Sequence, residues 1–316
     1  MWKNIIRSVA FFLIFALIFL GITPIFVPKN NYPSAGIHEA DAKGFLAEPD
    51  NTLDVLFLGD SEVFSNFIPL RIWEQHGITS YLCSTANQVP YQSYSYLQRV
   101  LRTQSPKIVV LEANALYRDF SIADMLSYRL QEYFPLMRYH DRWKDLTALD
   151  LSDPVSFTYQ IRDKGYTYRT RSIPANTEGY MTPAGEAYPM ATLSQWYFRK
   201  IQALCQERNI RLIVVSAPSP TNWDYYFHNG VVQLLEGQDI PYIDMNLMPE
   251  EIPIDWETDS YDGGDHLNYV GACKVTDHMG RVLWESGLFE DKREWESYSG
   301  WNEALENFNN VVASEQ

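Results

Sequence analysis

Five short apolar segments, each followed by a turn signal, limit what this chain can fold into. They cover residues 53–59, 78–84, 107–113, 211–217 and 241–245. Most are continuously apolar rather than alternating, as expected of parallel strands that are covered on both faces. Helical patterns follow or separate them over residues 68–76, 92–103, 193–208, 223–237 and 269–286. This alternation predicts an α/β fold with a doubly wound, flavodoxin-like parallel sheet.

The N-terminus contains a long apolar run. Residues 9–27 include no charged side chain and are long enough to cross a hydrocarbon core of ~30 Å. Lys3 and Arg7 precede the run, which places residues 1–8 in the cytoplasm and the remainder outside. We therefore expect a single-pass anchor in the cell membrane. A cleaved signal peptide is the alternative, but the run is long and no A-x-A site follows it.

The rest of the chain divides by composition. Residues 28–50 are rich in Pro, Gly, Ala and polar residues and predict a linker, followed by one domain over residues 51–288. A long insertion at about 117–191 separates the third strand from the next core helix. Residues 289–316 form an acidic, aromatic tail, either an amphipathic helix lying back on the domain or a docking segment.

Charge and cysteine content exclude some functions. The formal net charge of −15 argues against a nucleic-acid partner, because phosphate binding depends on Lys and Arg. Three cysteines are too few for a disulfide framework, and the sequence predicts free thiols. Histidines and cysteines show no metal-ligand spacing, so we expect neither a metal nor another cofactor.

Polar residues gather where the predicted strands end. Ser61 follows the first strand, Asn114 follows the third, and His266 comes after the fifth. Two carboxylates, Asp262 and Asp265, flank His266. Ligands of open α/β sheets bind beyond the carboxyl ends of the strands, so these side chains are expected to converge. A serine, a histidine and a carboxylate together predict acyl transfer.

Each residue has an expected role in that chemistry. Ser61 is the candidate nucleophile and His266 its general base. Asp262 or Asp265 would orient the imidazole. Asp262 is preferred, because the side chain of Asp265 is adjacent to that of His266 and adjacent side chains usually diverge. The two glycines after Asp262 let the chain loop back, so that Asp262 can reach His266. The Ser61 backbone N–H and Asn114 would stabilise the oxyanion. Supporting roles are considered for three more residues, Asp60, Glu112 and Asn87.

The sequence resembles the SGNH (GDSL-like) hydrolase superfamily over about residues 53–286. The resemblance rests on "GDSE" after the first strand, Asn114 after the third, and the late Asp…His pair. Two departures stand out. The family's Asp-x-x-His spacing would need an acid where Gly263 stands. The glycine that the family places after the second strand, as an oxyanion donor, is also missing; the sequence there reads "CSTANQ", in which Ser84 or Asn87 could substitute.

The anchor and "DHLN" are similar to the extracytoplasmic branch, which includes teichoic-acid D-alanyl transfer proteins and alginate-type O-acetyltransferases. The resemblance implies an O-acyltransferase or esterase that acts on cell-envelope or exported polysaccharide. It also implies an acylated glycan as substrate, and a membrane-bound O-acyltransferase as partner. His140 and Arg142 of the insertion are candidates for substrate binding, although their pattern is also typical of a solvated helix face. The alternative function is a non-catalytic glycan-binding or polysaccharide-assembly protein on a degenerate SGNH fold.

Overall fold

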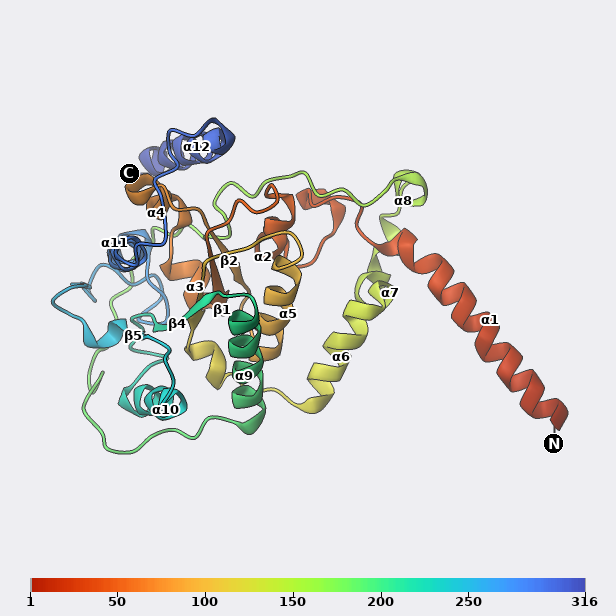
Figure 1. Cartoon of the computed structure of the whole chain (residues 1–316), viewed down its shortest axis with the longest axis horizontal. Helices are drawn as coiled ribbons and strands as arrows, with labels where there is room; N and C mark the ends of the chain where they lie inside the picture. Colours follow the sequence, from red (N-terminus) through yellow and green to blue (C-terminus); the bar gives the residue numbers. More distant parts are fainter. Residues whose placement is uncertain (1, 316) are drawn as a thin grey trace. The chain divides into compact units, whose positions relative to one another are not determined.

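The computed structural model describes residues 2–315 and contains one parallel sheet (Figure 1). Its five strands follow the spatial order β2-β1-β3-β4-β5. They are β1 (Val55–Gly59), β2 (Ser80–Ser84), β3 (Ile108–Glu112), β4 (Arg211–Ser216) and β5 (Tyr242–Asp244). This order is the flavodoxin-like one, and all four neighbouring pairs are parallel. The predicted fold class is confirmed.

Helices cover both sides of this sheet. On one side lie α3 (Ser61–Asn66), α4 (Pro69–His76) and α11 (Tyr269–Glu285), and α11 packs against the other two. On the other side α5 (Pro90–Val100) packs against α9 (Thr192–Glu207), as Figure 1 shows. The helix α10 (Tyr225–Leu235) lies beside β5. Strands β1, β2 and β3 are buried along their whole length, which explains their continuous apolar sequences.

The chain divides into two compact units, and the first contains the N-terminal helix. This unit comprises residues up to 40 together with residues 120–159. Its helices are α1 (Trp2–Phe26), α6 (Ile122–Tyr133), α7 (Pro135–Tyr139) and α8 (Leu149–Ser152). The rings of Phe19 and Phe134 lie 5.8 Å apart. Asn31 exchanges two hydrogen bonds with the backbone of Tyr159, at 2.6 and 2.9 Å. The first half of the insertion therefore folds onto the N-terminal segment.

Helix α1 is 25 residues long, apolar and without a buried residue, and it is long enough to cross a membrane. Length and composition are equally those of a signal sequence. The segment that follows it, residues 28–50, contains short helical turns, including α2 (Ala40–Lys43).

The second unit, residues 41–119 and 160–315, holds the sheet and the second half of the insertion. Residues 160–191 form no helix or strand, but they are fixed by backbone hydrogen bonds. Thr167 N–H donates to Phe64 O at 2.8 Å, and Ile173 N–H donates to Ser260 O at 2.9 Å. The insertion thus returns across α3 and across the loop that precedes α11.

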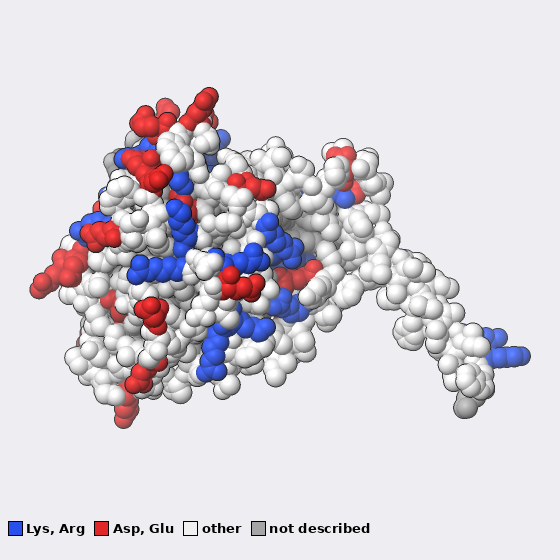
Figure 2. Space-filling model, viewed as in Figure 1, with Lys and Arg blue, Asp and Glu red and all other residues white. Residues whose placement is uncertain are grey.

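The C-terminal residues form α12 (Ser299–Glu315), an amphipathic helix that packs against α4. Its buried side chains recur at intervals of three or four residues: Trp301, Ala304, Phe308 and Val312. Trp301 and Trp73 of α4 have ring centroids 5.5 Å apart. Acidic side chains gather around this end of the molecule in Figure 2, while Lys and Arg are interspersed with acids elsewhere on the visible face. The amphipathic-helix alternative for the tail is therefore the one that the structure shows.

Candidate active site

The turn between β1 and α3 holds Ser61 at the carboxyl edge of the sheet. A Cβ atom at Gly59 would lie 2.6 Å from Val63 Cγ2 and 2.7 Å from Glu112 Cβ, so only glycine fits there. Asp60 is the N-cap of α3, and its Oδ1 accepts the Glu62 N–H at 3.1 Å. Ser61 is the first residue of the helix and is 9% exposed. Its N–H has no acceptor within the helix, as is general for first-turn residues.

The end of β3 is tied to this turn through Asp60. Asp60 Oδ2 accepts hydrogen bonds from Asn114 Nδ2 at 3.1 Å and from Arg118 Nε at 2.7 Å. The second contact is an ion pair with a fully buried carboxylate. Asn114 therefore lies beside the Ser61 turn with one amide proton engaged and a second one available.

The loop before α11 folds back so that Asp262 meets His266. Gly263 and Gly264 adopt left-handed backbone angles, with φ of 85° and 101°, which glycine permits. Asp262 Oδ1 accepts the His266 backbone N–H at 2.7 Å, and Asp262 Oδ2 lies 2.7 Å from His266 Nδ1. Asp265 Oδ2 is 3.7 Å from the same nitrogen, beyond hydrogen-bond distance.

His266 is also attached to the helix that begins with Ser61. The N–H of Leu267 donates to Asn66 Oδ1 at 3.2 Å, and Asn66 Nδ2 donates to Glu62 Oε2 at 2.7 Å. A ring nitrogen of His266 and a carboxylate oxygen of Glu62 lie within 4.8 Å of each other. Within residues 2–315, His266 Nε2 is buried and has no hydrogen-bond partner. The imidazole thus has one nitrogen fixed by a carboxylate and the other unengaged.

Three buried carboxyl groups lie together beneath this site. Burial raises the pKa of Glu62 and of Glu112 well above the usual range, and the nearby Asp60 raises both further. Burial also raises the pKa of Asp60, while the Arg118 guanidinium opposes that shift. These environments disfavour the charged forms of Glu62 and Glu112, whereas the Arg118 guanidinium favours the charged form of Asp60.

Glu62, Asp265 and His266 form a group whose ligand atoms could approach one metal ion. Both Glu62 oxygens, however, already accept amide hydrogen bonds: Asn222 Nδ2 donates to Oε1 at 2.8 Å, and Asn66 Nδ2 to Oε2. Asn222 Nδ2 also donates to Asp265 Oδ1. A buried carboxyl with a raised pKa and two donors is a poor metal ligand, and we assign no metal to this group.

The remaining candidate residues lie elsewhere or have other contacts. Glu112 Oε2 accepts the Ala115 N–H at 3.3 Å, which shapes the turn after β3. Asn87 is an exposed turn residue with a positive φ of 53°, and Ser84 pairs with Gly59 in the sheet register. His140 and Arg142 belong to the first unit. There Arg142 binds Asp150 Oδ1 at 2.9 Å and Phe26 O at 2.7 Å.

Sequence reasoning missed Arg118 and Asn222, although both follow the ends of core strands. Arg118 comes six residues after β3, and Asn222 six residues after β4. The rule that ligands bind beyond the carboxyl ends of strands would have included both. What the sequence could not supply was their partners, Asp60 and the Glu62–Asp265 pair.

Comparison with known proteins gives a likeness of fold. No protein-family model matches the chain, and no curated protein matches it. Similar solved structures include a GDSL-like lipase from Bacteroides thetaiotaomicron, with 10% identity and a TM-score of 0.40 over 78% of this chain and 99% of that one. A family 3 carbohydrate esterase from Clostridium thermocellum has 14% identity and a TM-score of 0.37 over 74% and 99%. A lipase/acylhydrolase from Enterococcus faecalis has 9% identity and a TM-score of 0.36 over 74% and 96%.

Proposed function

We propose that this chain is an SGNH-like serine acyl-ester enzyme, an esterase or O-acyltransferase. One observation carries the proposal: Asp262 holds His266 Nδ1 at 2.7 Å, while the buried Nε2 has no partner among the described residues. A carboxylate in that position fixes the imidazole tautomer in which Nε2 can accept a proton. An imidazole held in this way can take a proton at Nε2, which supports its proposed role as general base for Ser61.

The reaction would proceed in two half-reactions. Ser61 Oγ attacks the ester carbonyl as His266 Nε2 takes the hydroxyl proton, and Asp262 stabilises the resulting imidazolium. Collapse of the tetrahedral intermediate returns that proton to the leaving alcohol and forms an acyl ester on Ser61. In the second half, a glycan hydroxyl or water gives its proton to His266, attacks the acyl carbonyl and releases Ser61.

The negative oxygen of each tetrahedral intermediate needs fixed donors. The Ser61 N–H lies at the start of α3 without an intrahelical acceptor, and it would donate to this oxygen. Asn114 Nδ2 would supply a second donor. Its orientation is set by Asp60, which Arg118 in turn holds. Asp60 and Arg118 are thus assigned positioning roles.

We further propose that α1 anchors the enzyme in the cell membrane, with the sheet-bearing unit outside. Lys3 and Arg7 at the start of the helix support this orientation. An acylated polysaccharide of the cell envelope is the proposed substrate, and a membrane-bound O-acyltransferase is the proposed source of acyl groups. These assignments follow the family resemblance of the sequence.

Covalent labelling tests the nucleophile. The full chain in nanodiscs would be treated with a serine-directed phosphonate and with an activated acetyl ester, and the added mass located by peptide mass spectrometry. We expect an adduct on Ser61 that is absent in Ser61→Ala, much slower in His266→Ala and retained in Ser65→Ala, one helical turn away. A well-folded protein that reacts with neither reagent would refute the proposal and favour a non-catalytic glycan-binding role.

A further inference from the structure

Two arginines of the returning insertion stand over one aromatic ring beside the proposed site. The Arg169 guanidinium carbon lies 4.7 Å from the ring centroid of Tyr261, and that of Arg171 lies 4.6 Å from it. Tyr261 directly precedes Asp262, the residue that holds His266. Both guanidiniums therefore adjoin the loop that carries the proposed base.

Each arginine is held in place by contacts within the same unit. Arg169 NH1 donates to Ser65 Oγ at 2.9 Å, and its guanidinium lies 5.5 Å from the ring of Phe64. Ser65 follows Ser61 by one turn of α3, so it lies on the same face of that helix. Arg171 Nε donates to the backbone oxygen of Tyr261 at 3.2 Å. Arg169 is thus tied to the helix that carries Ser61, and Arg171 to the loop that carries Asp262.

Neither guanidinium is neutralised by the protein. Among residues 2–315, no carboxylate oxygen lies within 4.0 Å of Arg169 or Arg171. The nearest acids of the loop have other partners, since Asp262 binds His266 and Asp265 accepts from Asn222. The chain has 40 acidic and only 25 basic residues, so two arginines beside one ring that have no ion-pair partner in the described part of the chain are unexpected.

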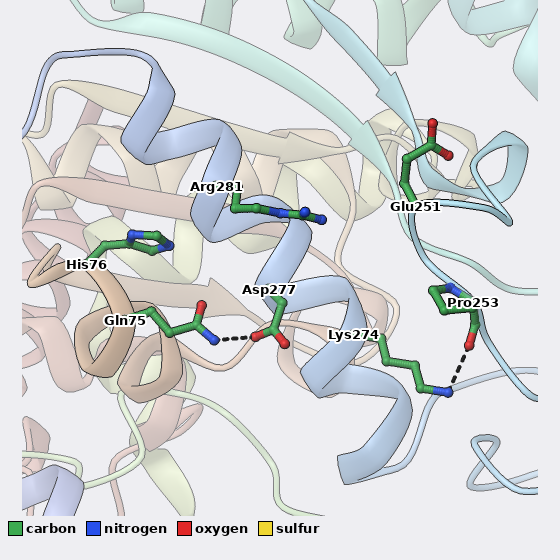
Figure 3. A pocket seen from close by; sticks show the side chains of 7 residues that line it. All are labelled: Gln75, His76, Glu251, Pro253, Lys274, Asp277 and Arg281. Atoms are coloured by element: carbon green, nitrogen blue, oxygen red, sulfur yellow. Dashed lines mark hydrogen bonds between the residues drawn. The ribbon is translucent and has the colours of Figure 1, made fainter.

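A pocket elsewhere in the same unit has a different arrangement of charges. This cavity of about 490 Å³ between α4, α11 and the loop around Pro253 is drawn in Figure 3. There Lys274 Nζ binds Asp259 Oδ2 at 2.6 Å and Pro253 O at 2.8 Å, and Asp277 accepts from Gln75 at 2.6 Å. Arg281 extends across the pocket on the side of Glu251. The lining holds as many acidic side chains, Glu251 and Asp277, as basic ones, Lys274 and Arg281, so this pocket gives no signal for an external anion.

We infer that Arg169 and Arg171 bind an anionic group of the glycan substrate, a carboxylate or a phosphate. The inference rests on the proposed function for the identity of the substrate. Planar guanidiniums match both groups through paired N–H donors, and the Tyr261 ring lies within cation–π distance of both. The enzyme would thereby select acidic polysaccharides over neutral ones.

Binding without turnover tests this inference. Ser61→Ala in phosphatidylcholine nanodiscs would be titrated calorimetrically with three oligosaccharides of equal length: an oligouronate, a glycerol-phosphate oligomer and a neutral glucan. We expect at least one anionic oligomer to bind at least tenfold more tightly than the neutral one. Arg171→Gln should weaken that binding about tenfold, and Arg171→Lys less. Arg281→Gln removes the same charge from an exposed arginine of the pocket in Figure 3 and should change nothing.

Equal affinity for the neutral and anionic oligomers would overturn the inference, as would equal effects of Arg171→Gln and Arg281→Gln. So would loss of anionic binding in nanodiscs that contain phosphatidylglycerol, because the cations would then be serving lipid headgroups. Phosphonate labelling separates this result from the proposed function. Normal labelling of Ser61 without anion selectivity refutes only the subsite, whereas anion binding without labelling refutes only the catalysis.

Discussion

Asp262→Asn tests the catalytic geometry most directly, because the structure dictates how the new side chain must turn. Asp262 Oδ1 accepts the backbone N–H of His266 at 2.7 Å, and Oδ2 faces His266 Nδ1 at the same distance. An asparagine keeps the first bond by turning its carbonyl oxygen to that N–H. Its NH₂ group then faces Nδ1, which must become an acceptor. The ring proton moves to Nε2, and the base for Ser61 is lost.

The expected loss in acylation rate is about 10⁴-fold, equivalent to about 5 kcal/mol, which is the size of effect that a wrong tautomer produces. Asp265→Asn is the matched control, since this side chain is 41% exposed and lies 3.7 Å from Nδ1. Without a hydrogen bond to the imidazole, it should contribute less than about tenfold, or about 1 kcal/mol.

The assay is the pre-steady-state release of the chromophoric leaving group from an activated acetyl ester. Rates would be normalised to the fraction of Ser61 that a phosphonate can titrate, and circular dichroism would confirm that each variant is folded. If Asp265→Asn lost about 10³-fold or more and Asp262→Asn lost less than about tenfold, the assignment of the triad acid would be wrong.

Three further changes probe the framework of the site. Arg118→Met leaves the buried Asp60 carboxylate without its cation and should lower the free energy of unfolding by about 3 kcal/mol at pH 8. Because Asp60 would then have a higher folded-state pKa, this loss should shrink towards pH 5 in urea titrations; a loss that does not depend on pH would contradict the reasoning. Gly264→Ala places a Cβ 2.9 Å from Ala175 Cβ at φ 101° and should cost about 1–3 kcal/mol with a fall in activity. Gly263→Ala, whose nearest atoms are 3.8 Å away, should cost less in the same thermal melts, and equal losses would argue against a packing cause. Phe308→Ala removes a buried ring of α12 and should cost about 3–5 kcal/mol of unfolding free energy without changing the Ser61 labelling of folded protein.

Local patterns predicted the sheet because the strands β1, β2 and β3 are buried along their whole length. The predicted strand at residues 107–113 is β3, Ile108–Glu112, and the predicted helix at residues 193–208 is α9, Thr192–Glu207. Continuous apolar runs indicate strands that are buried on both faces, and helical periodicity indicates helices with one buried face, which is what the structure shows. The polar strand ends then converge for a topological reason, since parallel strands share one carboxyl edge.

Contacts made by irregular segments could not be predicted in this way. Arg169 and Arg171 lie in a stretch without helix or strand, so no periodicity indicates which residues they meet. The two glycines before His266 did indicate that the loop folds back to Asp262, because their flexibility is a local property. The pairing of Asp60 with Arg118 joins residues 58 positions apart and depends on the tertiary fold.

The composition of the first unit bears on what removal of the N-terminal helix would do. That unit is built from two stretches of chain, so three peptide connections, near residues 40, 119 and 159, lead to the sheet-bearing unit. A single proteolytic cut after α1 would not simply shed a leader. It would strip Phe134 of its partner Phe19, and Arg142 would lose the Phe26 carbonyl. The N-terminal helix thus supplies contacts to the unit that follows it, and its removal would leave these two side chains without those partners.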